Sequence, residues 1–292
     1  MATSDTLSNE RFPDVNSVPI STDISPPTSL NFNLLIREPS RNFEIENGHA
    51  AMAANERFLV YFAKQILVVI DRNGNERLKL NKFIDPYDIC WSSYLNKFLI
   101  LGKIGRYGLD LEVGVEDIQT TESDNGFGRC ITCYDKTCLI VYQKSLIEEY
   151  ELPTWLLKKT FSPPQSWKAT QTISRIRFTS NGSHVGVVIS EGSLDRHFSF
   201  ELRRPNDMAV LQTVQMGTDF SAIAWLLALP NEEFLVNTVI KKKFYLIDSN
   251  GQLKEEIDYD NNGRLIVSTT LINERCLVVK TENPWELRFY DL

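Results

Sequence analysis

Histidines, cysteines and closely spaced glycines are the residues of this chain that could do chemistry. The 292 residues include only three histidines, His49, His184 and His197. A serine or cysteine nucleophile would need one of them as its base, and no G-x-S-x-G nucleophile elbow occurs. Because histidines are more often packed or surface residues than catalytic ones, we assign no catalytic residue.

The cysteines include one spacing that could bind a metal. Cys130, Cys133 and Cys138 form the pattern C-x-x-C-x-x-x-x-C, while Cys90 and Cys276 stand apart. Zinc sites usually have four ligands, and residues three apart in a strand face opposite sides of the sheet. We therefore predict small buried thiols, with no metal and no cofactor. An odd number of scattered cysteines also suits a reducing compartment.

Three glycines, Gly102, Gly105 and Gly108, are spaced closely enough for their backbone N–H groups to hold a phosphate. The segment lacks the Lys-Ser/Thr pair and the following helix of a P-loop. We therefore expect a glycine-rich hairpin at this place.

Charge and hydropathy exclude several classes of protein. The net charge of −7 and the pI near 5.2 oppose broad binding to nucleic acid, which needs an excess of Lys and Arg. The N-terminus does not have the pattern of a secretory signal. The longest apolar run, residues 222 to 229, is far shorter than the roughly 18 residues of a membrane span. We expect a cytoplasmic, soluble and monomeric protein that binds neither nucleic acid nor membrane.

The chain divides into a tail and one domain. Residues 1–29 are rich in Ser, Thr, Asn, Asp and Pro, so we expect a flexible N-terminal tail, followed by a single domain over residues 30–292. From about residue 45 onward, short apolar runs alternate with turn residues and almost no segment has helical spacing. Asp-x-Asn-Gly at residues 71–74 and 248–251 predicts tight turns between strands. The pattern indicates an all-β fold.

A repeat runs through this all-β region. NERFLVYFAKQILVVIDRNG, residues 55–74, returns as NEEFLVNTVIKKKFYLIDSNG at residues 231–251. Apolar stretches that follow a polar turn recur at intervals of 40, 40, 46, 50 and 42 residues. They begin at Phe58, Phe98, Cys138, His184, Phe234 and Cys276.

A second landmark has the same period, because an apolar residue followed by an acid comes 12 to 16 residues after most of these stretches. The pairs are Ile70-Asp71, Leu111-Glu112, Tyr150-Glu151, Phe200-Glu201, Ile247-Asp248 and Tyr290-Asp291. Units of about 40 residues with four short strands are typical of a β-propeller.

In these pairs the chain resembles the WD-repeat propellers, in which the third strand of a blade commonly ends in Trp-Asp. The resemblance covers about residues 30–292 and concerns architecture. It implies an all-β β-propeller of six four-stranded blades, with seven blades as the alternative. Because the last unit ends at Leu292 one strand short, we expect the segment 31–39, NFNLLIREP, to supply the outer strand of the last blade.

Basic residues recur at the predicted turns between the second and third strands of the blades. They are Lys64, Lys103, Arg106, Lys144, Arg196, Lys241, Lys242, Lys243 and Lys280. Such turns share one face of a propeller, so these residues would form a basic rim suited to an acidic or phosphorylated segment of a protein partner. Lys is also common in exposed turns for structural reasons alone.

Two functional hypotheses follow. The first is a non-catalytic scaffold that binds a macromolecular partner through a propeller face, as the resemblance to WD-repeat proteins implies. The alternative is a propeller-type hydrolase acting on a lactone, an ester or a glycoside at the central channel. An enzyme would need acids or histidines with shifted pKa values converging on the axis, and the sequence shows no such set.

Overall fold

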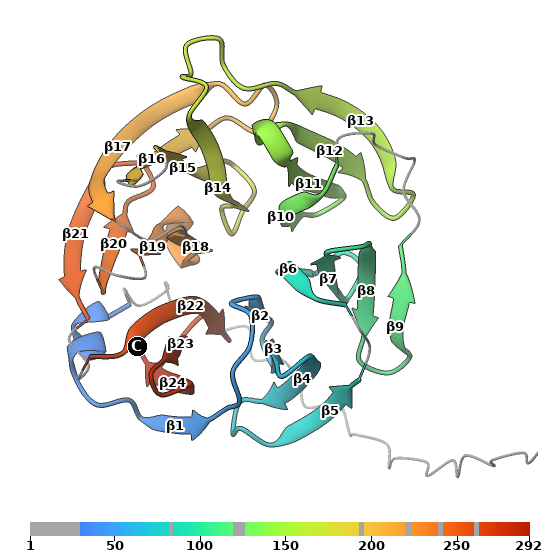
Figure 1. Cartoon of the computed structure of the whole chain (residues 1–292), viewed down its shortest axis with the longest axis vertical. Helices are drawn as coiled ribbons and strands as arrows, with labels where there is room; N and C mark the ends of the chain where they lie inside the picture. Colours follow the sequence, from blue (N-terminus) through green and yellow to red (C-terminus); the bar gives the residue numbers. More distant parts are fainter. Residues whose placement is uncertain are drawn as a thin grey trace, which may run out of the picture.

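The structure is a computed structural model that describes residues 30–81, 84–118, 126–192, 196–219, 224–238, 242–259 and 263–292. These residues form six four-stranded antiparallel sheets, the blades, arranged in a ring around a central axis (Figure 1). The expected six-bladed β-propeller is thereby confirmed, and the described residues contain no seventh sheet.

Each blade runs outward from the axis in chain order. Blade 1 contains β2 (Met52–Ala54), β3 (Phe58–Ala63), β4 (Ile66–Asp71) and β5 (Glu76–Leu80). Blade 2 contains β6 (Pro86–Ser92), β7 (Lys97–Gly102), β8 (Arg106–Asp110) and β9 (Gly114–Asp117). Blade 3 contains β10 (Gly128–Tyr134), β11 (Thr137–Tyr142), β12 (Ile147–Glu151) and β13 (Leu156–Phe161), with the 3-10 turn η2 (Gln143–Ser145) between β11 and β12.

The second half of the ring repeats this order. Blade 4 contains β14 (Gln171–Phe178), β15 (Val185–Glu191), β16 (Arg196–Arg203) and β17 (Val210–Asp219). Blade 5 contains β18 (Ala224–Ala228), β19 (Phe234–Thr238), β20 (Lys243–Ile247) and β21 (Leu253–Asp258), with the 3-10 turn η3 (Pro230–Glu232) after β18. Blade 6 contains β22 (Leu265–Ile272), β23 (Cys276–Glu282) and β24 (Glu286–Asp291).

The outer strand of blade 6 comes from the N-terminal side of the chain, as expected, but from different residues. The strand β1 (Arg41–Glu44) pairs antiparallel with β24, whereas the segment expected to pair contains the 3-10 helix η1 (Phe32–Ile36). Phe32 and Leu35 are three residues apart, so a 3-10 turn places both on one side, and both are buried in the apolar cluster shared by blades 5 and 6. Burial of this pair explains why the segment is not a strand.

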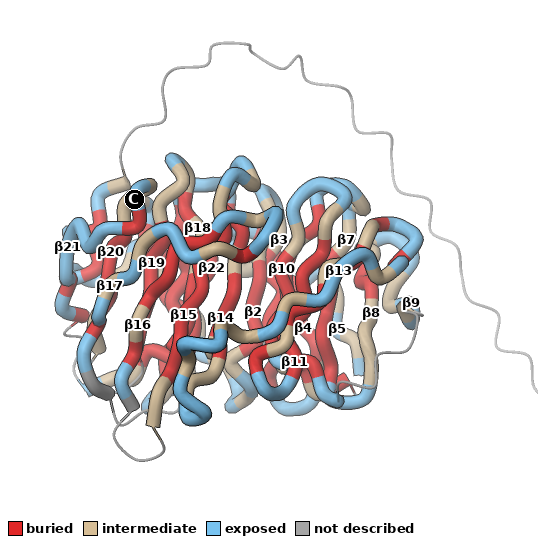
Figure 2. Tube along the Cα trace, turned by 90° about the horizontal axis from the view of Figure 1, so that it is seen from above, coloured by how far each residue is buried: buried red, intermediate tan, exposed pale blue. Residues whose placement is uncertain are grey.

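Packing between neighbouring blades forms the core. The recurring apolar stretches of the sequence belong to the second strand of each blade, and most of their residues are buried (Figure 2). Phe200 of blade 4 and Phe234 of blade 5, with ring centroids 5.2 Å apart, show how one blade packs on the next. A single blade could not bury both of its apolar faces, and this need for stacked neighbours accounts for the repeat in the sequence.

The acid at the end of the third strand has a local structural role. Asp71 Oδ1 accepts hydrogen bonds from the N–H groups of Asn73 and Asn75, each at 2.9 Å, and Asp248 makes the equivalent bonds at its own turn. In blade 2 this role belongs to Asp110, which ends β8, and not to the expected Leu111-Glu112 pair.

Candidate partner-binding face

The two faces of the ring differ in the turns that they carry. We call the face at which the innermost strands β2, β6, β10, β14, β18 and β22 begin the entry face, and the opposite one the exit face. Because neighbouring strands are antiparallel, the turns between the second and third strands lie on the entry face. The expected basic residues can therefore be compared on one surface.

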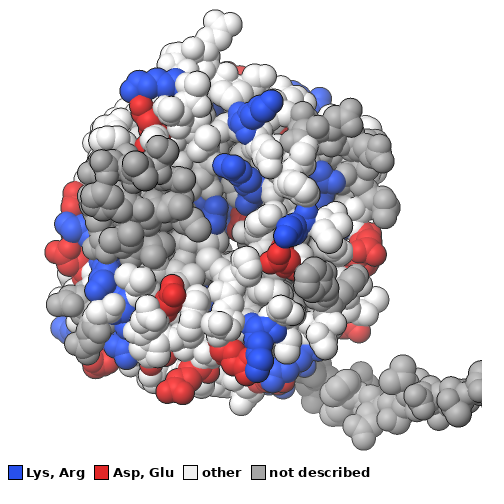
Figure 3. Space-filling view, in the orientation of Figure 1, with Lys and Arg blue, Asp and Glu red and all other residues white. Residues whose placement is uncertain are grey.

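Four of the expected lysines lie in these turns on the entry face. Lys64, Lys103 and Lys144 are exposed, and Lys242 is half-buried. Lys64 forms an ion pair with Glu46 at 3.0 Å, whereas Lys103 and Lys144 form no ion pair with any described residue. Figure 3, which looks onto this face, shows several Lys and Arg side chains around the central opening.

Two other expected cations are engaged with the blades. Arg106, the first residue of β8, donates a hydrogen bond to the Tyr142 hydroxyl of blade 3, and its guanidinium lies 5.7 Å from the centre of the Tyr142 ring. Lys243 forms ion pairs with Glu256 at 3.0 Å and Asp258 at 3.4 Å. The Tyr142 contact occupies a donor of Arg106, and the two carboxylates offset the charge of Lys243, so both residues are less available to a partner.

Arg196 and Lys241 are the other two residues expected in these turns. Arg196 is the first residue of β16, at the entry face. Lys241 lies outside the described residues.

The placement expected for Lys280 was wrong. Lys280 lies within β23 and is fully buried between blades 6 and 1, because the turn to the third strand follows Glu282. Its Nζ donates hydrogen bonds to the carbonyl oxygens of His49 (2.6 Å) and Phe62 (2.8 Å). Burial lowers the pKa of Lys280 to about 7, and the residue is therefore part of the seam between the last and first blades.

The glycine-rich hairpin lies where it was expected. It joins β7 to β8, and the Gly102 N–H donates to the Gly105 carbonyl oxygen at 2.8 Å, which closes the turn tightly.

Two arginines that the sequence reasoning missed lie at the mouth of the channel. Arg129 on β10 and Arg175 on β14 line a hollow of about 350 Å³ between blades 3 and 4, together with Gln143 of the η2 turn. Arg129 is exposed and Arg175 is 9% exposed. The spacing of Arg175 and Arg177 in the sequence could have indicated two guanidinium groups on one face of a strand, because residues two apart in a strand face the same side.

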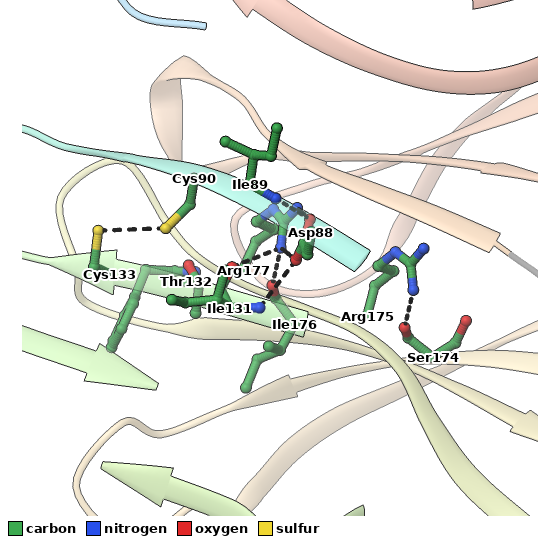
Figure 4. A network of polar contacts seen from close by, with 11 residues as sticks. Asp88, Ile89, Cys90, Ile131, Thr132, Cys133, Ser174, Arg175, Ile176 and Arg177 are labelled. Carbon is green, nitrogen blue, oxygen red and sulfur yellow. Dashed lines mark hydrogen bonds and ion pairs between the residues drawn. The ribbon is translucent and has the colours of Figure 1, made fainter. Parts of the chain in front are cut away.

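Arg177 is held by an acid from a different blade (Figure 4). Its Nη2 lies 2.7 Å from Asp88 Oδ1 and its Nη1 lies 2.8 Å from Asp88 Oδ2, so the pair is bidentate. Asp88 is fully buried on β6 and also accepts the Ile131 N–H at 3.0 Å. Burial alone would lower the pKa of Arg177, but the charge of Asp88 and its hydrogen bonds outweigh it and raise that pKa above its ordinary value.

The cysteines lie on opposite faces of β10, as the spacing of three predicted. Cys130 is buried towards blade 4, whereas Cys133 and Cys138 face blade 2, where the Sγ atoms of Cys90 and Cys133 are 3.7 Å apart. Burial raises the pKa of Cys130 to about 12, so this thiol stays protonated at neutral pH. Within the described ranges, no three His, Cys, Asp or Glu side chains are grouped closely enough to hold a metal ion.

The channel also opens at the exit face, in a hollow of about 410 Å³. His184 lies on this face, and Ser183 Oγ is 2.9 Å from both His184 Nδ1 and Glu232 Oε2. In a catalytic triad the imidazole lies between the hydroxyl and the carboxylate, whereas here the hydroxyl lies between the other two groups. This arrangement ties the β14–β15 turn to η3 and is not a nucleophile–base–acid relay.

Comparison with known proteins supports the fold and leaves the function open. No known protein family and no curated protein matches the sequence. Among solved structures, 1362 chains match, too broad a set to indicate one function. One is a chain from a crystal structure of the mitotic checkpoint complex, at a TM-score of 0.59 and 10% identity, covering 97% of this chain and 99% of that chain.

The chain is therefore a six-bladed β-propeller. Among the described residues, none of the helices, which are short 3-10 turns, is long and apolar enough to cross a membrane.

Proposed function

We propose that this propeller is a non-catalytic scaffold whose entry face binds an acidic or phosphorylated segment of a protein partner. The observation that carries the proposal is the set of lysines at equivalent turns of neighbouring blades, of which Lys103 and Lys144 are exposed without an ion pair to any described residue. A rigid ring holds these charges at fixed separations, so a partner meets them without first ordering the surface.

The alignment with a chain of a multi-protein complex supports the coarse part of this proposal, since that chain aligns with this one over nearly its whole length at a TM-score of 0.59. The charge of the partner is argued from the entry face alone. Interactions between exposed charges are screened by salt over about 10 Å at 0.1 M, so we expect binding to weaken as ionic strength rises.

Affinity capture from lysate at low and high salt, followed by cross-linking of the bound protein, tests the proposal. The test variant is Lys103→Glu with Lys144→Glu, and the control is Arg72→Glu with Lys136→Glu, which reverses exposed charges at turns of the exit face. We expect a salt-sensitive partner that cross-links to the entry face and is lost only in the test variant. Capture that survives the test variant, or that is lost equally in the control, would contradict the proposal.

A further inference from the structure

The hollow between blades 3 and 4 contains a buried cation without a matching anion among the described residues. The Arg175 side chain forms no ion pair with any of them, its Nε has no hydrogen-bond partner, and its Nη1 donates only to the adjacent Ser174 carbonyl oxygen at 2.7 Å. Burying a charged group without a counter-charge is unfavourable. Burial accordingly lowers the pKa of Arg175 below its ordinary value.

Arg177, two residues further along the same strand, shows how this protein neutralises a buried guanidinium when the purpose is structural. Arg177 has the bidentate Asp88 carboxylate, and Figure 4 shows the hydrogen bond of Arg175 to the Ser174 carbonyl oxygen. The Arg175 guanidinium carbon lies 3.8 Å from the centre of the Trp225 ring. Stacking on an aromatic face orients a guanidinium and leaves its edge available for a planar or tetrahedral anion.

The rest of the hollow is suited to an anion. Arg129 supplies a second, exposed guanidinium, and the described lining residues include no Asp or Glu. Thr172 Oγ1 and Ser190 Oγ in the wall share a hydrogen bond of 3.0 Å, so one of the two hydroxyl groups can still donate to a ligand. Two guanidinium groups and a hydroxyl donor match the oxygens of a phosphate monoester.

We propose that this hollow, lined by Arg129, Arg175, Thr172 and Ser190, binds the phosphate group of a phosphorylated side chain from the partner protein. The inference rests on the proposed scaffold function and names the chemistry of one subsite on the entry face. Two neighbouring features favour a peptide over a free phosphate. Lys144 lies in the turn that also supplies Gln143 to the lining, and Phe127 at the rim is 56% exposed. A peptide can place an acidic residue against Lys144 and an apolar residue against Phe127, and a free phosphate cannot.

Titration of the purified chain with three probes tests this inference. The probes are a short peptide with one phosphoserine between neutral residues, the same peptide with unmodified serine, and inorganic phosphate, each followed by calorimetry. We expect the phosphopeptide to bind and the serine peptide not to bind, because only the former supplies the anion. Inorganic phosphate should bind more weakly than the phosphopeptide. If inorganic phosphate binds as tightly as the phosphopeptide, the assignment to a peptide is overturned.

Variants locate the binding. Arg129→Gln changes an exposed residue, so the variant should retain the fold. We expect it to bind the phosphopeptide about tenfold or more weakly. Arg175→Gln should have an equal or larger effect, with far-ultraviolet circular dichroism as the check on folding. Arg72→Gln on the exit face is the matched control and should leave binding unchanged. The absence of phosphopeptide binding at millimolar concentrations, or binding unaffected by Arg129→Gln, would overturn the inference.

The two proposals can fail separately. If Arg129→Gln weakens neither phosphopeptide binding nor capture, while Lys103→Glu with Lys144→Glu abolishes capture, the scaffold function stands and the phosphate subsite does not. If partner capture is insensitive to every entry-face substitution, the proposed function itself fails.

Discussion

Asp88 and Arg177 form a bidentate ion pair between two blades that are not neighbours in the ring. Asp88 belongs to β6 of blade 2 and Arg177 to β14 of blade 4, and the Arg177 Nη1 also donates to the Ile131 carbonyl oxygen of blade 3 at 3.0 Å. The pair therefore connects the inner strands of three consecutive blades close to the axis. Blade-to-blade packing is otherwise a contact between neighbours, so this polar link adds cooperativity that apolar stacking does not supply.

The first prediction concerns this pair. Asp88→Asn leaves the Arg177 charge buried without its partner, so we expect the free energy of unfolding to fall by about 3–5 kcal/mol, measured by urea denaturation. Glu151→Gln is the control, because its ion pair with Lys158 at 3.0 Å is half-exposed and should contribute less than about 1 kcal/mol. Equal losses in the two variants would show that the buried pair does not link the blades as we describe.

The second prediction concerns closure of the ring. Removal of residues 1–29 should change the melting temperature little, because composition predicts a flexible tail. Removal of residues 1–45 also deletes β1, leaves the edge of β24 unpaired and removes the buried Phe32 and Leu35. We expect the longer deletion to lower the melting temperature by many degrees and to promote association through the exposed edge. Coincident melting curves for the two deletions would argue against closure by β1.

The third prediction concerns the tight turn after β4. Gly74 has φ +83°, and a Cβ there would collide with the Phe43 ring of the closing strand. Gly114 also has positive φ, +104°, but has open space around it. Gly114→Ala should lower the free energy of unfolding by about 1 kcal/mol through backbone strain alone, and Gly74→Ala should lower it clearly more. Denaturant titration of both variants measures the two losses in unfolding free energy, and their difference gives the effect of the collision with Phe43. Equal losses would mean that Phe43 moves aside freely.

The fourth prediction concerns pH. The Lys280 pKa is about 7 in the folded protein against an ordinary value of 10.5, so the unfolded chain binds more protons between these pH values. Stability should therefore rise as pH increases above about 7, with a slope up to about 1.4 kcal/mol per pH unit from this residue.

Lys280→Met isolates this contribution, because groups common to both proteins cancel in the difference. We expect the variant to show a shallower increase in unfolding free energy between about pH 7 and about pH 9. If the variant and the parent chain gain stability in parallel over this range, Lys280 is charged in the folded state.

The local parts of the fold could be predicted from the sequence. Asp71 and Asp248 are followed by Asn-Gly at the same distance, and each aspartate bonds to N–H groups within four residues, so the turn depends only on neighbouring residues. The period of the apolar stretches predicted six blades for the same reason, since each stretch is one strand. The opposite orientation of Cys130 and Cys133 followed from the two-residue repeat of a strand.

The candidate site was less accessible to sequence reasoning. The turns that carry Lys64, Lys103 and Lys144 were predicted, and the structure places all three on the entry face. Arg129 and Arg175 were missed, because their importance depends on which blades meet at the hollow and on the fact that Asp88 pairs with Arg177, which leaves Arg175 without an ion pair to a described residue. A list of basic residues in turns cannot separate Arg106, which is engaged with Tyr142, from Lys144, which is exposed.

The sequence by itself determined the repeat unit, the all-β character and the turn chemistry, because these depend on residues close together in the chain. Tertiary structure alone decided that β1 and not residues 31–39 closes the ring, that Lys280 is buried at the seam, and that Asp88 reaches Arg177. Each of these contacts joins residues that are far apart in the chain. Their partners are selected by the packing of whole blades, and no local pattern records that choice.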